Sequence, residues 1–301
     1  MKTETKWAVD IVRYRVCYST LKPLRLHEYP GSAWRGAFGH AFKAVACTQT
    51  DDRCERCPEN SLCPYPLLFS AGETIARPYL LEPHAFVGYF PEGAVLTLDV
   101  VVLGWLNAQL ALLCAAFERL GAQGLGMRAA VPLHLLMIQQ QVGKDWAMLT
   151  LEDGARHAPP PAPLIIPPPP VRARVDLITP LKLKYRNNLI SPEDFRASDL
   201  LVALARRFEA CATILDTLPL PPEPTQWLAD ADTLFERTQL SWHDTRHYSS
   251  RQRTAIKLGG FVGTLWLHGP VLQRIWPWLW VGQWLHLGSS ATIGFGCYRI
   301  R

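Results

Sequence analysis

Residues 159–170 read PPPAPLIIPPPP, a run with eight prolines in twelve positions that divides the chain into two comparable halves. Proline fixes φ and has no amide N–H, so this run can form neither a helix nor a central strand. It predicts a semi-rigid, extended connector. We therefore expect an N-terminal domain over residues 1–158 and a C-terminal domain over residues 171–301.

Strand and helix patterns succeed one another in roughly the same order in both halves. The strand patterns cover residues 8–19, 76–83, 93–104 and 131–142 in the first half, and 171–185, 253–269 and 297–300 in the second. The helix patterns cover residues 32–46, 107–122, 191–215 and a tryptophan-rich stretch over 271–288. This order is the split βαββαβ arrangement. It predicts an α+β protein of two tandem ferredoxin-like (RRM-like) domains, a type of sheet that often holds single-stranded RNA.

The bulk composition is that of a globular protein that does not enter membranes. Of the 301 residues, 49% are hydrophobic, and the net charge of +5 permits a polyanionic partner without requiring one. The N-terminus has no apolar signal core, and the apolar stretch over 271–288 is interrupted by Arg274, Pro277 and Gln283. We expect a cytoplasmic protein with no membrane partner.

Four cysteines lie close together in a polar, turn-rich stretch of the first half. Cys47, Cys54, Cys57 and Cys63 have the spacing C-x6-C-x2-C-x5-C. Because disulfides are disfavoured in the cytoplasm, this cluster predicts a small metal-binding insert over residues 47–63. A structural Zn²⁺ fits four thiolates, and a [4Fe–4S] cluster is the alternative. Four protein ligands leave no position for water, so the metal would brace the insert rather than catalyse a reaction.

The first helix, WRGAFGHAFKAV, has an apolar arc and a polar arc at 100° per residue. The polar arc holds Arg35, Gly36, Gly39, His40 and Lys43. His40 is suited to acid–base chemistry near neutral pH, and the two cations beside it would attract phosphate. Since glycine weakens a helix, the two glycines predict that a backbone or a ligand approaches this face closely.

A basic, aromatic run, SWHDTRHYSSRQR, spans residues 241–253, and Lys257 follows it. Arginine and lysine neutralise phosphates and aromatic rings accept stacked bases, so the run is typical of a single-stranded nucleic-acid site. Asp244, His247 and Ser249 do not form a catalytic triad, because neighbours in one strand point to opposite faces. The alternative is a solvated loop with incidental charge.

The stretch GSSATIGFG, residues 288–296, lies close to the end of the chain. It is not a dinucleotide fingerprint, because a strand-like GCYRIR follows it instead of a helix. It is not a phosphate-binding P-loop either, since no Gly-Lys-Ser/Thr closes it. The glycines predict a loop whose backbone passes close to a partner elsewhere, and the first helix is one candidate.

These motifs together resemble the CRISPR-associated endoribonucleases of the RAMP superfamily that process precursor CRISPR RNA. The resemblance rests on RGAFGHAFK, the cysteine insert ending in CPYPLLF, ITPLKLK, RHYSSRQ with LGGFVG, and LHLGSSATIGFGCYRI. It covers nearly the whole chain in the right order. It implies a glycine-rich loop beside the first helix that contacts the RNA backbone, with Gly288, Gly294 and Gly296 letting amides approach phosphates.

The resemblance also implies a reaction. The 2′-OH of a ribose would attack the adjacent phosphate in the repeat RNA without a metal, leaving a 2′,3′-cyclic phosphate and a 5′-hydroxyl. His40 matches the histidine that family members often carry in this helix. The expected catalytic residues are His40, Lys43 and Tyr248. The expected RNA-binding residues are Arg35, His243, Arg246, Arg251, Lys257, Gly288, Ser289, Ser290, Gly294 and Gly296.

Two functions from different classes are consistent with this sequence. The first is the endoribonuclease that generates crRNA. The second is a non-catalytic RAMP subunit that holds crRNA inside a CRISPR effector complex. The histidine on the first helix and the RNA-contact features in both halves favour the endoribonuclease.

Overall fold

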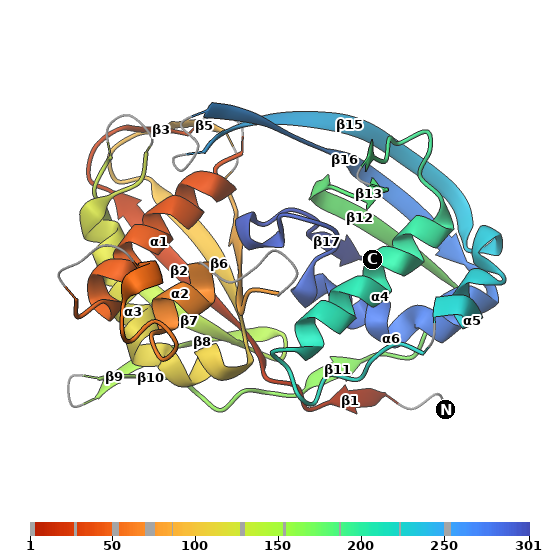
Figure 1. Ribbon diagram of the computed structural model, residues 1–301, viewed down its shortest axis with the longest axis horizontal. Helices are drawn as coiled ribbons and strands as arrows, with labels where there is room; N and C mark the ends of the chain where they lie inside the picture. Colours follow the sequence, from red (N-terminus) through yellow and green to blue (C-terminus); the bar gives the residue numbers. More distant parts are fainter. Residues whose placement is uncertain are drawn as a thin grey trace. The chain divides into compact units, whose positions relative to one another are not determined.

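The chain divides into two compact units in a computed structural model (Figure 1). The structure describes residues 4–26, 29–49, 54–69, 76–85, 87–126, 130–152, 155–186, 188–222, 224–249 and 254–301. One unit contains residues 10–161, and the other contains residues 1–9 together with residues 162–301. We call them the N-terminal unit and the C-terminal unit, although the latter also includes the beginning of the chain.

The N-terminal unit is a five-stranded antiparallel sheet with two main helices. Its elements are β2 (Ile11–Thr20), α1 (Gly31–Ala46), β4 (Tyr79–Pro83), β6 (Val95–Leu103), α3 (Leu110–Gln123), β7 (Leu133–Val142) and β8 (Asp145–Met148). The strand order is β4-β6-β2-β7-β8. Without the edge strand β8, this is the order of a βαββαβ fold, so the predicted ferredoxin-like arrangement is confirmed.

The core of this unit lies between one face of the sheet and the helices α1 and α3, which lie side by side (Figure 1). Alternate residues of β2, namely Val12, Tyr14, Val16 and Tyr18, point into this core. The residues between them, including Arg13 and Arg15, therefore lie on the opposite face of the sheet. Shorter strand pairs, β3 (Leu24–Leu26) with β5 (Gly88–Phe90) and β9 (Thr150–Glu152) with β10 (Ala155–His157), complete the unit.

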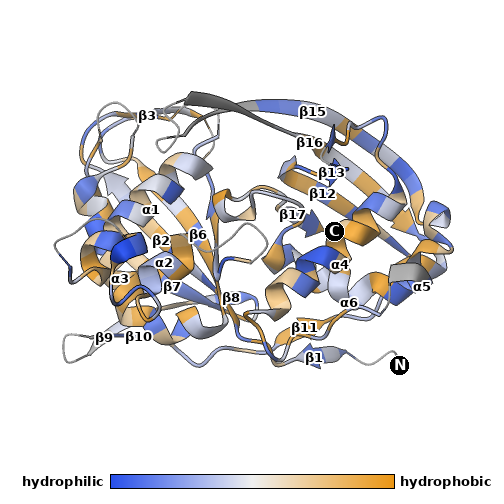
Figure 2. Cartoon of the chain, viewed as in Figure 1, coloured by the Kyte–Doolittle hydropathy of each residue, from blue (hydrophilic) through white to orange (hydrophobic). Residues whose placement is uncertain are grey.

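The C-terminal unit repeats the same topology. Its elements are β12 (Arg172–Leu181), α4 (Ala197–Ala212), β15 (Phe235–Ser249), β16 (Thr254–His268), α6 (Gly269–Leu285) and β17 (Tyr298–Ile300). The strand order is β15-β16-β12-β17, again that of a βαββαβ fold. Val175, Leu265 and Leu267 are fully buried on one face, beneath the neighbouring helices α4 and α6. Figure 2 shows β15 as largely hydrophilic where it is coloured, as expected for a long edge strand.

The proline-rich connector is more than a spacer. Within it, β11 (Leu164–Ile166) pairs in antiparallel fashion with β1 (Thr5–Trp7). The side chains of α6 hold the connector, because Trp276 donates a hydrogen bond to the carbonyl of Pro167 and Trp280 donates one to that of Ile165. Residues 1–9 therefore belong to the C-terminal unit, whereas the sequence assigned them to the first domain.

The predicted start of one helix is wrong. Helix α1 begins at Gly31, within one residue of the predicted range 32–46, and no side chain caps it. Helix α4 begins at Ala197, whereas the pattern over residues 191–215 placed its start at Ser191. Residues 191–194, Ser-Pro-Glu-Asp, close a separate turn instead, in which the Ser191 hydroxyl accepts a hydrogen bond from the amide of Asp194. None of the helices in the described part of the chain is long and apolar enough to cross a lipid bilayer.

Candidate functional site

Helix α1 presents His40 to solvent on the side opposite its core residues. Trp34, Phe38 and Phe42 are buried as the helical periodicity predicts, and His40 is exposed. Gly36, one turn earlier, is also exposed, and a Cβ atom there would meet no atom within 4 Å. The surface beside the imidazole is therefore free of side chains at Gly36, which leaves room for a bulky ligand.

Gly39 has a different environment. It is buried, and a Cβ atom there would lie 3.1 Å from the ring of Phe69, on the short helix α2 (Pro64–Phe69). The prediction that a ligand or a second backbone approaches both glycines is thus wrong for Gly39, because an aromatic ring of the same unit fills that space. The apolar arc was predicted from periodicity alone, which carries no information about α2.

Arg35 on α1 and Arg77, just before β4, form a pair of cations. The Arg35 guanidinium lies 5.7 Å from the centre of the Phe69 ring. Burial lowers the pKa of Arg77, and the charge of Arg35 lowers it further, so the two groups are close. Burial raises the pKa of the Tyr79 hydroxyl to about 12, although both arginines act in the opposite direction. Tyr79 is therefore neutral at physiological pH. Sequence reasoning missed Arg77, which has no motif around it.

Lys43 faces the cysteine insert. Its Nζ atom lies 5.6 Å from the centre of the Tyr65 ring on α2, and its charge lowers the pKa of the Cys54 thiol. Lys43 thus connects the helix that carries His40 with the insert. Its predicted catalytic role is not tested by these contacts and stays a prediction.

The four cysteines of the insert are partly buried free thiols. Cys54 and Cys57 are joined by a tight turn, in which the amide of Cys57 donates to the carbonyl of Cys54. Burial raises the pKa of the Cys54 thiol, and negative charge on Cys47, Cys63 or Cys57 would raise it further, so the four thiols are neighbours. By contrast, Cys17, Cys114, Cys211 and Cys297 are buried elsewhere.

This donor set fits a tetrahedral metal in its chemistry. Four thiols on one short, polar segment match the ligands of structural zinc and of iron–sulfur clusters. Among the described residues, the four sulfur atoms do not form a group whose members all lie within 4.8 Å of one another. A bound metal would therefore have to draw them closer together.

The glycine-rich loop packs against the end of β12 through its own backbone. A Cβ atom at Gly288 would lie 2.5 Å from the carbonyl oxygen of Lys182, and one at Gly296 would collide with the carbonyl of Leu287. Both glycines have positive φ angles, of 70° and 69°. The partner that these two glycines approach is thus the chain itself, which the sequence could not show.

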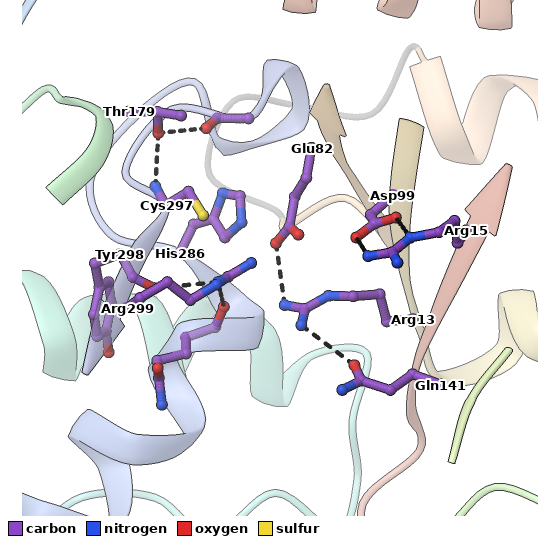
Figure 3. Close-up of polar contacts among 12 residues, drawn as sticks. Arg13, Arg15, Glu82, Asp99, Gln141, Thr179, His286, Cys297, Tyr298 and Arg299 are labelled. Atoms are coloured by element: carbon purple, nitrogen blue, oxygen red, sulfur yellow. Dashed lines mark hydrogen bonds and ion pairs between the residues drawn. The ribbon is translucent and has the colours of Figure 1, made fainter. Parts of the chain in front are cut away.

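Several amides of this loop are already used inside the unit. The amide of Gly296 donates to Pro180, that of Gly294 donates to Ala291, and that of Ser289 donates to Lys182. Thr179 clamps the same loop, since its hydroxyl donates to the carbonyl of Gly294 and accepts from the amide of Cys297 (Figure 3).

The outer part of the loop is different. Gly288, Ser289 and Ser290 are at least partly exposed, and Ser290 has a left-handed φ of 69°. Residues other than glycine adopt this conformation at a cost and are often found in functional sites. Lys182 and Lys184, in the adjoining segment, bring positive charge next to this loop.

The basic run does not form a loop over residues 241–249, because β15 includes all of them and pairs with β16. His243 is exposed. In the backbone register of the two strands, Arg246 lies opposite Lys257 and Tyr248 lies opposite Ala255. The predicted contact Arg251 lies outside the described residues.

Trp242 is held as a fixed, exposed ring on β15. Its indole Nε1 donates a 2.8 Å hydrogen bond to Asp244, and 37% of the residue is exposed. A Cβ atom at Gly259 would collide with the indole, so the ring lies directly on the backbone of β16. One side of the ring is thus supported by a residue that has no side chain.

Solved structures share the fold of this chain. A Cas6 product complex has a TM-score of 0.59 at 13% identity, over 97% of this chain and 99% of that chain. Thermus thermophilus Cas6 has a TM-score of 0.56 at 15% identity, over 98% and 99%. A partial Cas6-RT-Cas1–Cas2 complex has a TM-score of 0.59 at 11% identity, over 97% of this chain and 46% of that chain. At these identities the likeness concerns the fold alone.

Two family models match the sequence. Residues 175–298 match the family described as CRISPR-associated endoribonuclease Cas6, and residues 9–163 match an N-terminal domain family described as AF_1859_N. No curated protein is detectably similar in sequence. Residues 175–298 thus match the Cas6 family of CRISPR-associated endoribonucleases, in agreement with the resemblance that the sequence motifs carry.

Proposed function

We propose that this protein generates crRNA by cutting CRISPR repeat RNA without a catalytic metal. A ribose 2′-OH attacks the adjacent phosphorus, the bond to the 5′-oxygen of the next nucleotide breaks, and the products carry a 2′,3′-cyclic phosphate and a 5′-hydroxyl. Such a reaction needs a base for the 2′-OH proton, an acid for the leaving oxygen, and cations for the charged phosphorane. The match of residues 175–298 to an endoribonuclease family supports the substrate class.

The exposed imidazole of His40 is the observation that carries this proposal. A histidine can accept and donate protons near neutral pH, and this one stands on a rigid helix with open space over Gly36. We assign it the principal acid–base role.

Cations beside α1 would stabilise the phosphorane. Arg35 and Arg77 are near each other and partly buried, where a fixed positive charge acts more strongly on a phosphate than it does in water. We assign these two residues to phosphate binding. Lys43, which contacts Tyr65, would assist them, and Tyr248 would assist proton transfer.

Residues of the C-terminal unit would bind the rest of the RNA. The exposed part of the glycine-rich loop, with Gly288, Ser289 and Ser290, would accept phosphates beside Lys182. On β15 and β16, Trp242 offers a ring for base stacking, and His243, Arg246 and Lys257 would contact the backbone. We assign Gly294 and Gly296 to the folding of the loop, because the amides of both are engaged within it.

Four thiolates would hold a structural metal in the insert. Cys47, Cys54, Cys57 and Cys63 would bind Zn²⁺, which would brace the segment that follows α1. A [4Fe–4S] cluster is the alternative occupant. Lys43 of α1 contacts Tyr65 of α2, and α2 directly follows the insert. The metal would therefore support the helix that carries His40.

The test is cleavage of the cognate repeat RNA in EDTA by the wild type and by His40→Ala. We expect a single cut with a cyclic-phosphate end for the wild type. The variant should lose a factor of about 10² to 10⁴ in rate, the usual contribution of general acid–base catalysis. His134→Ala is the matched control, because His134 is an exposed imidazole on β7 of the same unit. It should cleave like the wild type.

Three results would change this assignment. Normal cutting by His40→Ala would remove the proposed role of the imidazole. Loss of wild-type activity in EDTA, with the metal content of the cysteine insert unchanged, would contradict the metal-independent reaction. Tight RNA binding without any cleavage would make the protein a crRNA-holding subunit instead, which is the alternative function.

A further inference from the structure

We propose that the helix-free face of the C-terminal sheet is a second RNA-binding surface, centred on Trp266, that binds single-stranded RNA through its phosphates. This inference rests on the proposed function only in taking RNA as the ligand. It concerns residues that belong neither to α1 nor to the glycine-rich loop.

The surface is a row of four residues across the sheet. In the strand register, Arg237 of β15 lies opposite Trp266 of β16, and Trp266 lies opposite Arg174 of β12. Arg174 in turn exchanges two backbone hydrogen bonds with Arg301. Residues opposite each other point to the same face, so this row lies on the face opposite to the buried Val175 and Leu265.

The row is built around the indole ring. The guanidinium carbon of Arg237 lies 5.0 Å from the centre of the Trp266 ring, and that of Arg174 lies 6.0 Å from it. Such contacts restrain both guanidinium groups. Each also donates to a neighbouring side chain, Arg174 to Asp176 and Arg237 to Gln239. A guanidinium carries five N–H donors, so each group has further donors that can bind a phosphate. A restrained arginine loses less conformational entropy when it binds a phosphate than a free one does.

Charge on this face favours an anion. Asp176 is the one carboxylate that these arginines contact within the described residues, and it accepts hydrogen bonds from Arg174 and Thr264. The Nε atom of Arg301 lies 3.2 Å from its other oxygen. Among the side chains alone, three guanidinium groups and one carboxylate leave two positive charges. The side chains of Arg174 and Arg301 are 47% and 68% exposed, and Arg237 is exposed as well.

Single-stranded RNA fits this surface better than other anions do. Its phosphates would pair with the guanidinium groups, and an unpaired base would stack against the aromatic and guanidinium planes. An acidic protein segment would satisfy the charges but would not use the indole. We therefore assign the row to a stretch of RNA without sequence preference.

The experiment measures binding of a single-stranded oligouridylate across a series of KCl concentrations. Compared with the wild type, Arg174→Ala/Arg237→Ala should bind about tenfold more weakly. The slope of log K against log salt should become shallower by about 1.4, since each phosphate contact contributes about 0.7 for a single strand. Arg119→Ala/Arg206→Ala is the matched control, because it removes two exposed helical arginines, and its slope should equal that of the wild type.

Two further variants separate charge from folding and from stacking. Arg174→Lys/Arg237→Lys keeps the charges and should keep the wild-type slope. Trp266→Ala should weaken binding about tenfold without changing the slope, because it removes stacking and no charge. Circular dichroism spectra that match the wild type would establish that each variant is folded.

An unchanged affinity and slope for Arg174→Ala/Arg237→Ala would overturn the proposal. So would a change that appears only in the oligomeric state, which would make a second copy of the chain the occupant. A wild-type protein that cuts repeat RNA but does not bind oligouridylate would overturn this inference alone. Failure of His40→Ala to reduce cutting would affect only the proposed reaction.

Discussion

At the scale of single residues, the same residue type serves different purposes at different positions. Gly36 leaves an open surface, Gly39 admits a ring of α2, and Gly288 lets the backbone pass the carbonyl of Lys182, which follows β12. A sequence displays the glycine but not the atom that approaches it. Interpretation of the glycines from sequence was therefore right about close approach in the terminal loop, where the neighbours of Gly288 and Gly296 are carbonyls of the same unit. The predicted contact of this loop with RNA stays a prediction.

Gly36 offers a direct test of access to His40. Gly36→Ala places a methyl group in open space and should raise the free energy of unfolding by about 1 kcal/mol, because alanine favours the helix. Cleavage should be retained. Gly36→Phe should instead hinder the approach of RNA and lower kcat/KM while leaving the protein folded. Chemical denaturation and cleavage kinetics check the two outcomes, and equal activity of both variants would contradict the proposed access route.

Asp99 gives a prediction for pH. Burial alone would raise the pKa of this carboxyl, but hydrogen bonds from Arg15 and His84 hold it below the usual range. Figure 3 shows the pair of Arg15 with Asp99. A carboxyl whose pKa is lower in the folded state stabilises the fold above its unfolded pKa of about 3.9, and this contribution is lost as the pH falls through the folded value.

Asp99→Asn should therefore lose about 3 kcal/mol of stability at pH 7, because Arg15 is left without its charged partner. The difference from the wild type should shrink at acid pH, below about 4. Denaturation curves over a pH series measure this. Asp145→Asn, at an exposed position on β8, is the control and should match the wild type throughout.

At the scale of elements, the order of strands and helices followed from the sequence, whereas several boundaries did not. Periodicity predicted α1 and α3, each of which has one buried face, and apolar strand patterns predicted β2 and β6, which are buried along most of their length. The helix pattern placed α4 too early, because Ser191 and Asp194 look like a helix start but close a turn of their own. The strand β15 was taken only as a basic run, since an exposed edge strand lacks the hydrophobic alternation of a buried one.

The cysteine insert is an element whose metal content can be measured. The purified protein should contain about one zinc per chain by elemental analysis, since four thiolates complete one tetrahedral site. Cys54→Ser/Cys57→Ser should lose the metal, whereas Cys17→Ser should retain it, because Cys17 is buried on β2. A brown protein containing iron would identify the cluster instead. Protein that lacks both metals would contradict the site.

At the scale of the whole molecule, the tandem topology was predictable because the proline-rich run separates two halves with the same pattern. What the sequence could not indicate was that β1 pairs with β11 across more than half of the chain. Strand pairs over such a distance leave no local signal. The same limit applies to Arg174, Trp266 and Arg237, which only the sheet register brings together.

Trp7 tests the attachment of the first residues to the C-terminal unit. Its ring contacts those of Phe208 and Trp278 at 6.3 and 6.1 Å, and only 8% of the residue is exposed. Trp7→Ala should destabilise the protein by about 3–5 kcal/mol, as expected for a large buried aromatic residue. Lys6→Ala, at its exposed neighbour, should change stability little. Equal stability of both variants in urea would show that this strand is dispensable.

The pairing of β1 with β11 also limits how the protein can be taken apart. Cleavage within the proline-rich connector would divide the chain into an N-terminal and a C-terminal fragment. The C-terminal fragment would lack β1 and the Trp7 indole, which packs on its aromatic residue Trp278. Expressed alone, such a fragment should aggregate through the bare aromatic patch. A synthetic peptide carrying the missing strand should restore its solubility.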